Sequence, residues 1–264
     1  MKRVLTAGVL LPVVVLLVRL DPPVYFFALA CVVIILALLE LYRLAERRGA
    51  RPQRWVGVPG ALLVASSFLA AGPDLRAVLA ACAIASPLAA LVARQPLQEA
   101  LMSMSITLFG VLFLGLLIGY QVGLRGIDRV GAELVLYLLW VVWTSDAAAY
   151  FVGTRFGRRP LAPSVSPNKT LEGTVAGMVA ALLAAWVGKL WFMQSLPWRD
   201  AAILGLLMGA SALAGDLCES LLKRGSEVKD SAALLPGHGG MLDRTDSLLF
   251  SAPILYHYWK WLGI

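Results

Sequence analysis

The run PVYFFALACVVIILALLEL, residues 23–41, carries one charged side chain in nineteen positions. A helix of about 20 apolar residues is long enough to cross the ~30 Å hydrocarbon core of a bilayer. The run therefore predicts a membrane-spanning helix. Similar runs recur along the chain, and we expect nine spans, at roughly 4–20, 23–41, 55–72, 75–93, 101–120, 132–152, 173–191, 201–222 and 247–262.

The composition supports an integral membrane protein. Of the 264 residues, 59% are hydrophobic and 15% are charged, whereas soluble domains carry about 25% charged residues. Cys31, Cys82 and Cys218 all lie inside apolar runs, without disulfide or metal-ligand spacing, so we expect them to be small core residues. The predicted fold class is all-α, a polytopic protein of about nine transmembrane helices.

The distribution of basic residues predicts the orientation. With a cytoplasmic N-terminus, the inside segments hold 16 of the 23 Lys and Arg residues and the outside segments hold 7. Cytoplasmic loops are enriched in Lys and Arg, so we expect the N-terminus inside and the polar segments 153–172 and 223–246 on the cytoplasmic side. No small-x-small cleavage site follows residues 1–20, which predicts a retained first helix.

The chain divides by content into two regions. Residues 1–130 hold about five spans and no obvious chemistry, which is typical of a scaffold or dimerisation region. Residues 131–264 hold both polar segments and are the predicted catalytic region. The net charge of +7 is explained by topology and by anionic lipid headgroups, so we expect no nucleic-acid partner.

Two acidic residues lie inside predicted spans. Counted from the starts of their spans at 1.5 Å per residue, Asp146 and Asp216 reach roughly 21 and 22 Å, at a similar depth near the cytoplasmic boundary. An ionisable residue within a span marks a candidate functional site. The alternative is that each acid faces water or pairs with a basic neighbour.

A third acidic group lies at the start of the last span. Asp243 and Asp246 are spaced i, i+3 with Arg244 between them, and they are candidate ligands for a hard cation. Asp246 could instead cap the helix. On the preceding span, Asp216, Ser220 and Lys223 share one helical face, with Arg224 beside them and Lys229 beyond.

The segment SPNKT, residues 166–170, precedes Glu172-Gly173 and a new apolar run. Ser166, Lys169 and Thr170 could cradle phosphate, but Thr170 or Asn168 could equally be a helix cap. His238 lies among Gly237, Gly239 and Gly240. It could act as a general base, as a hydrogen-bond donor to phosphate or as a structural hydrogen-bonding group.

The order of these residues resembles the signature of the phosphatidate cytidylyltransferase family, also called CDP-diacylglycerol synthases. The pattern runs through Ser220, Lys223-Arg224, Lys229-Asp230, Pro236-Gly237-His238-Gly239-Gly240 and Asp243-Arg244-Thr245-Asp246 with its spacing intact. The segment from Ser166 to Gly173 resembles a second family motif, although Asn168 stands where Lys is common. The resemblance is strong over about the last half of the chain.

The resemblance implies a reaction of CTP with phosphatidic acid that gives CDP-diacylglycerol and pyrophosphate, with Mg²⁺ and in some members K⁺. It implies Asp216, Asp243 and Asp246 as metal carboxylates that act in catalysis with Lys223 and Arg244. It also implies a homodimer in a bacterial inner membrane with a cytoplasmic active site. The expected CTP and phosphate contacts are Ser166, Lys169, Thr170, Ser220, Arg224, Lys229, His238 and Asp146.

Two other functions would use similar features. A CTP-dependent lipid kinase would need the same metal and phosphate groups, but it would release CDP rather than pyrophosphate. A transporter would explain several spans and buried acids, but many transporter folds are built from repeated halves. No internal repeat is visible in this sequence.

Overall fold

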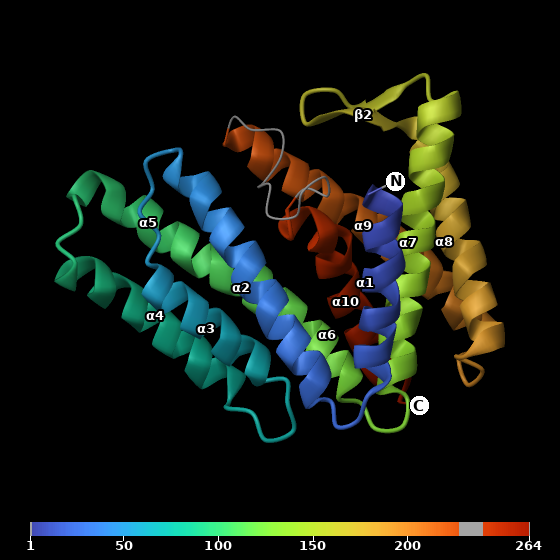
Figure 1. The fold of residues 1–264 in the computed structure, drawn as a ribbon, viewed down its shortest axis with the longest axis horizontal. Helices are drawn as coiled ribbons and strands as arrows, with labels where there is room; N and C mark the ends of the chain where they lie inside the picture. The colour runs from blue at the N-terminus through green and yellow to red at the C-terminus, as the bar shows by residue number, and fades with distance from the viewer. Residues whose placement is uncertain (1, 227–239, 264) are drawn as a thin grey trace. The chain divides into compact units, whose positions relative to one another are not determined.

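The computed structural model describes residues 2–226 and 240–263, with side chains from Leu11 onward (Figure 1). The chain forms two compact units, one of residues 1–126 with 226–244 and one of residues 127–225 with 245–264. Lys229 and His238 fall outside the described residues.

The first unit is helical throughout its described part. It contains α1 (Lys2–Arg19), α2 (Val24–Glu46), α3 (Arg54–Ser66), α4 (Leu75–Val92), α5 (Leu97–Gly110), the π-helix η1 (Val111–Leu116) and α6 (Leu117–Arg125). It also holds the first residues of α10 (Leu242–Leu262), which continues into the second unit.

The second unit contains the elements that line the candidate site. These are α7 (Gly131–Phe156), the strands β1 (Pro160–Ala162) and β2 (Ser166–Thr170), α8 (Leu171–Trp191), α9 (Trp198–Gly225) and the rest of α10. The two strands pair antiparallel, with Pro160 opposite Thr170 and Ala162 opposite Ser166. The polar segment 153–172 is not a single loop between two helices, because α7 runs to Phe156 and a β-hairpin follows.

Each of the nine predicted spans falls on a helical segment of the described chain. Among the described residues, six segments are long and apolar enough to cross a membrane, namely Val24–Glu46, Leu75–Val92, Leu97–Arg125, Gly131–Phe156, Leu171–Trp191 and Trp198–Gly225. Of the others, α3 has only 13 residues, about 20 Å of helix against a ~30 Å hydrocarbon core. The chain is a helical membrane protein, and the count of nine spans stays a prediction.

Packing in the first unit depends on a buried tyrosine and small neighbours. Tyr42 is fully buried, and its hydroxyl donates a hydrogen bond of 3.0 Å to the Thr107 carbonyl. A Cβ at Gly57 would overlap the Tyr42 hydroxyl, and one at Gly110 would lie 2.8 Å from the same ring. Close helix contacts in membranes rely on such small residues.

Arg125 closes one end of the first unit. Its side chain is buried, donates hydrogen bonds to the carbonyls of Val18 (2.6 Å) and Leu20 (2.9 Å) and forms an ion pair with Asp21 (2.7 Å). From the sequence, Arg125 is only one of the basic residues counted to predict the orientation in the membrane. Its contacts show that it also joins the end of α6 to the end of α1.

Helix α8 presents two different faces. Small residues such as Gly177, Ala181 and Gly188 are buried, and Ser145 on α7 donates a hydrogen bond of 3.0 Å to the Gly177 carbonyl. The opposite face exposes large apolar side chains at positions four apart, Val175, Val179, Leu183 and Val187. Small residues toward protein and large ones outward are the arrangement expected of a lipid-facing helix.

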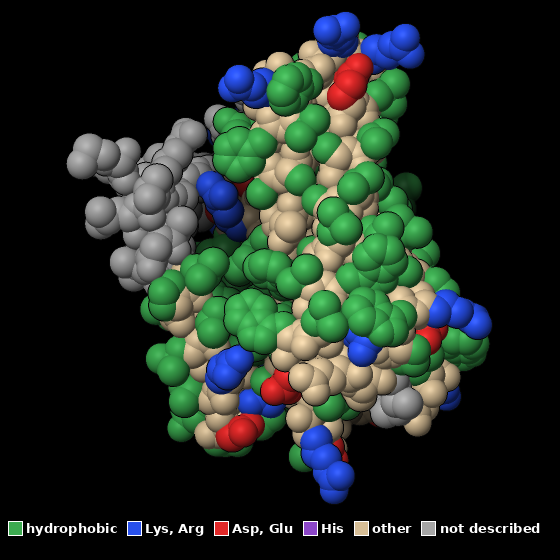
Figure 2. Space-filling view, turned by 90° about the vertical axis from the view of Figure 1, so that its right-hand side faces the viewer, with side chains coloured by type: hydrophobic (Ala, Val, Ile, Leu, Met, Phe, Trp, Pro, Cys, Tyr) green, Lys and Arg blue, Asp and Glu red, His purple; other side chains and the backbone are tan. Residues whose placement is uncertain are grey.

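Surface composition agrees with a membrane location. On the face shown in Figure 2, hydrophobic side chains cover much of the surface, with charged side chains scattered among them and at its upper and lower ends. Contiguous exposed apolar surface of this kind is rare on soluble monomers. Lipid is the natural solvent for it.

Candidate active site

A cavity of about 530 Å³ opens in the second unit between α7, β2, α8 and α9. It combines charged and polar groups with small residues that leave room. A Cβ at Gly173 would lie 2.7 Å from the Ala149 carbonyl oxygen, so only glycine allows α7 and α8 to approach this closely. The polar lining residues are Ser145, Asp146, Tyr150, Thr154, Ser166, Asn168, Lys169, Thr170, Thr174 and Asp216.

Three carboxyl groups from three helices meet beside this cavity. Asp216 on α9 and Asp246 on α10 lie close enough for their carboxyl groups to interact electrostatically. Asp146 on α7 lies within the same electrostatic range of both, and Asp246 accepts a hydrogen bond of 2.8 Å from the Ser247 N–H. The structure brings Asp146 and Asp216 to the same cavity, and their similar depth in the membrane stays a prediction.

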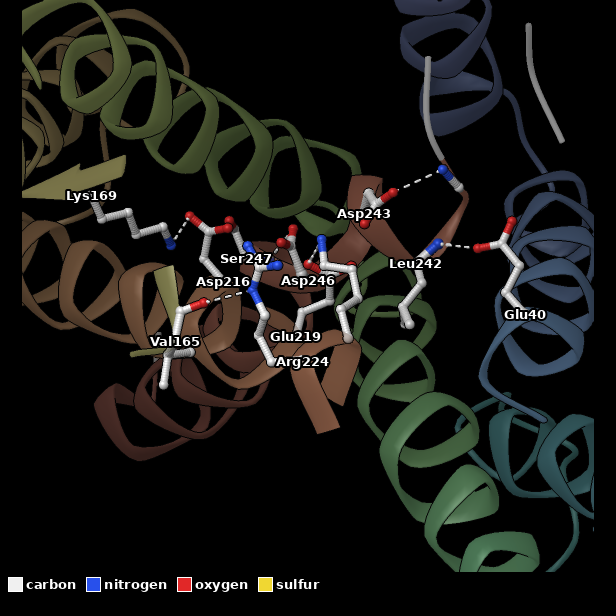
Figure 3. Close-up of polar contacts among 12 residues, drawn as sticks. Glu40, Val165, Lys169, Asp216, Glu219, Arg224, Leu242, Asp243, Asp246 and Ser247 are labelled. Carbon is white, nitrogen blue, oxygen red and sulfur yellow. Dashed lines mark hydrogen bonds and ion pairs between the residues drawn. The ribbon is translucent and has the colours of Figure 1, made fainter. Parts of the chain in front are cut away.

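Lys169 on β2 supplies the positive charge at this cluster. Its ammonium nitrogen lies 2.5 Å from the Asp216 carboxylate (Figure 3). The two side chains are 21% and 34% exposed, so the pair is partly screened by solvent. The predicted phosphate-binding lysine and the predicted metal carboxylate are therefore in direct contact.

The approach of α9 to α10 depends on Gly215. A Cβ at this position would overlap the Asp246 carbonyl oxygen. Deeper in the same helix pair, the hydroxyls of Ser211 and Ser251 lie 3.0 Å apart, and Ser251 also contacts the Met208 carbonyl at 3.2 Å. These contacts hold Asp216 and Asp246 side by side.

Thr170 has the capping role considered for it, and its phosphate-binding role stays a prediction. Its hydroxyl accepts a hydrogen bond of 3.2 Å from the Gly173 N–H at the start of α8, and its side chain lines the cavity. Glu172 accepts hydrogen bonds from the N–H groups of Arg158 (3.0 Å) and Arg159 (3.2 Å). These bonds anchor the hairpin that carries Ser166 and Lys169 over the cavity.

The capping explanation for Asp246 is wrong. Helix α10 begins at Leu242, so Asp246 lies one turn inside the helix, where it is 8% exposed. Asp243 lies in the first turn, and its carboxylate accepts a hydrogen bond of 2.9 Å from the Gly240 N–H. Asp243 and the exposed Arg244 belong to the first unit, whereas Asp216 and Asp246 belong to the second.

The basic residues at the end of α9 are on the helix rather than in a loop. Lys223 forms an ion pair of 2.7 Å with Glu219, which is 1% exposed. Arg224 donates a hydrogen bond of 3.4 Å to the Val165 carbonyl of the hairpin. Ser220 is partly buried on α9 and is not part of the described cavity wall.

Sequence reasoning missed two buried acids. Glu219 lies one turn after Asp216, and this spacing was a usable signal. Glu40 on α2 is fully buried and accepts hydrogen bonds of 2.9 Å from the N–H groups of both Met241 and Leu242. A charged residue inside an apolar run was the signal for Glu40.

The acidic cluster has the donor chemistry for Mg²⁺. Among the described residues, no three Asp, Glu, His or Cys side chains are positioned to bind one metal ion together. Mg²⁺ is commonly held by one or two carboxylates together with substrate phosphates, which Asp216 and Asp246 can provide. Two ionised carboxylates close to each other repel, and the Lys169 ammonium beside Asp216 offsets part of this repulsion.

Comparison with known proteins identifies the family. The pattern described as "Cytidylyltransferase family" matches residues 1–262. A phosphatidate cytidylyltransferase of Bacillus subtilis (strain 168) is 42% identical over 151 residues, which cover 57% of this chain and 56% of the relative. One from Synechocystis sp. is 37% identical over 191 residues, 62% of this chain and 64% of the relative.

A third relative, the phosphatidate cytidylyltransferase of Haemophilus influenzae, is 42% identical over 134 residues, covering 49% of this chain and 46% of the relative. The chain thus spans about half to two thirds of the length of these curated relatives. The family pattern, in contrast, extends over nearly the whole chain. This chain belongs to the cytidylyltransferase family.

Proposed function

We propose that this protein transfers the cytidylyl group of CTP to phosphatidic acid and so forms CDP-diacylglycerol and pyrophosphate. The observation that carries the proposal is the ion pair of Lys169 with Asp216, with Asp246 close by, beside a polar cavity in a membrane protein of the cytidylyltransferase family. The curated relatives named above carry this activity in their names.

The reaction needs positive charge that binds and stabilises the phosphate groups, and it needs no nucleophile from the protein. An oxygen of the lipid phosphate attacks the α-phosphorus of CTP, the bond from that phosphorus to the bridging oxygen breaks, and pyrophosphate departs with the electron pair. The lipid phosphate is already anionic at neutral pH. The protein must therefore bring two polyanions together and stabilise the charge that develops on the leaving group.

Specific residues in the second unit suit these tasks. Lys169 projects from β2 into the polar cavity, where an ammonium group can bind phosphate as a point charge. Ser166 and Thr170 supply hydroxyls on the same strand. Arg224, Lys223, Ser220, Arg244, Lys229 and His238 remain proposed phosphate or CTP contacts on the strength of the family pattern.

We propose Mg²⁺ as the cofactor, held by Asp216 and Asp246, and by Asp243 on the strength of the family pattern. A bound Mg²⁺ would neutralise charge on the phosphate oxygens during the transfer. Chelation with EDTA is expected to abolish turnover, and added Mg²⁺ to restore it. Adding K⁺ in the same titration tests whether a second cation contributes.

Product analysis tests the reaction. Purified protein in detergent is given phosphatidic acid and CTP labelled at the α-phosphate in one reaction and at the γ-phosphate in another. The expected result is α-label in a lipid product and γ-label in pyrophosphate. The γ-label appearing in lipid, with release of CDP, would instead establish a lipid kinase.

We further propose a bacterial inner-membrane location, a cytoplasmic active site and a homodimer. Bacterial relatives and the inside bias of basic residues support the first two, and the dimer follows from the family resemblance alone. Light scattering of the detergent-solubilised protein, corrected for bound detergent, measures the oligomeric state directly.

A further inference from the structure

Glu40 is the one fully buried acid of the described α2. Its carboxylate accepts hydrogen bonds from the backbone of Met241 and Leu242, which lie 201 and 202 residues later in the chain. One carboxylate oxygen accepts the Met241 N–H and the other accepts the Leu242 N–H, both at 2.9 Å; Figure 3 shows the bond to Leu242. All of these residues belong to the first unit.

The bonded groups are the first N–H donors of α10. Donors at a helix start have no partner within the helix and form its positive end, so a carboxylate there satisfies hydrogen bonds and interacts favourably with the helix dipole. Met241, which precedes α10, has an apolar side chain that cannot serve as a cap. A residue of another helix supplies the acceptor instead.

Burying a carboxylate within an apolar helix is unfavourable unless it is well hydrogen-bonded. Residues of this type inside membrane helices commonly mark functional sites. Here the bonded helix start leads directly to Asp243 and Arg244, which lie in the same unit as Glu40. We infer that Glu40 is a positioning residue that fixes the first turn of α10 and thereby the direction of these two side chains.

This inference rests on the proposed function and deepens it. The test compares Glu40→Gln, which keeps the size of the side chain but replaces one acceptor oxygen with a donor, and Glu40→Asp, which keeps the charge but is one methylene shorter. The matched control is Glu46→Gln on the same helix. Glu46 is exposed and pairs with Arg54 at 2.6 Å.

The first measurement is amide hydrogen exchange of the segment 240–246 in detergent without substrate. We expect at least tenfold faster exchange in Glu40→Gln, an intermediate increase in Glu40→Asp, and exchange within twofold of wild type in Glu46→Gln. Unchanged exchange in Glu40→Gln would overturn the inference, because the two backbone bonds would then not hold the helix start.

The second measurement is turnover, normalised to folded protein, as a function of Mg²⁺ concentration. We expect kcat to fall at least tenfold in Glu40→Gln and the half-activating Mg²⁺ concentration to rise at least threefold, with the KM for CTP within threefold of wild type. A loss of turnover that only follows the folded fraction, with an unchanged Mg²⁺ midpoint, would reduce Glu40 to a structural residue and overturn the proposal.

If Glu40→Gln cannot be purified in folded form, Glu40→Asp decides. Wild-type exchange and a wild-type Mg²⁺ midpoint in that variant would overturn the inference, since a shorter side chain cannot keep both bonds in place. If wild-type protein forms no CDP-lipid, the proposed function fails. The exchange experiment still tests the bonds of Glu40 independently.

Discussion

Asp246 is buried one turn inside α10, with its carboxyl group against that of Asp216. We predict that Asp246→Asn lowers turnover about 10²–10³-fold, the size of effect seen when one preorganised charge-stabilising group is removed from an active site. The fold should survive because Asn is nearly isosteric with Asp. Steady-state kinetics and the thermal unfolding midpoint in detergent provide the measurement.

The control for this substitution is Asp74→Asn. Asp74 is exposed at the N-terminus of α4, where its side chain accepts the Ala77 N–H at 2.8 Å. Asn is as good a helix cap as Asp, so turnover should stay within twofold. Near-normal turnover of Asp246→Asn would show that this carboxylate has only a structural role.

Substitutions of Lys169 and Arg244 test whether these basic residues bind phosphate or only set the orientation of the protein in the membrane. If both contact phosphate, Lys169→Gln and Arg244→Gln should each lower kcat/KM at least tenfold, about the 1.4 kcal/mol that a charge-assisted hydrogen bond supplies. Arg43→Gln removes one exposed charge elsewhere and should remain within twofold. Equal and mild effects at all three positions would mean that these charges serve orientation alone.

At the scale of elements, the α9–α10 contact is the feature that brings two carboxylates together. We predict that Gly215→Ala destabilises the protein by about 1–3 kcal/mol, as overpacking typically does, because the new Cβ would meet the Asp246 backbone. Turnover should fall with it, since Asp246 must shift away from Asp216. Thermal or denaturant unfolding and kinetics both report the change.

Gly225→Ala at the end of the same helix is the matched control. A Cβ there would have no atom of the described residues within 4 Å, so stability should stay the same or rise slightly through the lower entropy of the unfolded chain. If Gly215→Ala were equally harmless, the close approach of the two helices would not be required for the site.

At the scale of the whole molecule, the predicted orientation can be tested at the two ends of α7. Asp128 lies just before this helix and Ser164 lies in the hairpin beyond it. In a variant whose three free cysteines are replaced by Ala, we expect a membrane-impermeant maleimide to label Asp128→Cys in intact cells. Ser164→Cys should react only after the membrane is opened, and the reverse pattern would invert the topology.

Much of the fold followed from apolar runs, because a helix that spans a bilayer needs a minimum length of apolar sequence wherever it lies. The β-hairpin did not, since β1 and β2 have three and five residues and their polar sequence reads as a loop. The start of α10 at Leu242 was also missed, because the residue before it has no capping side chain and the acceptor comes from Glu40.

The sequence by itself determined the class of protein and most of the chemistry-bearing residues, because residue type and spacing alone distinguish a polar, motif-bearing segment from an ordinary connection between spans. Only the tertiary structure decided which of these residues meet. In the structure, Lys169 forms an ion pair with Asp216, and Asp246 lies close to Asp216. Thr170 caps the start of α8. Contacts between helices depend on packing at positions such as Gly215, which no local pattern encodes.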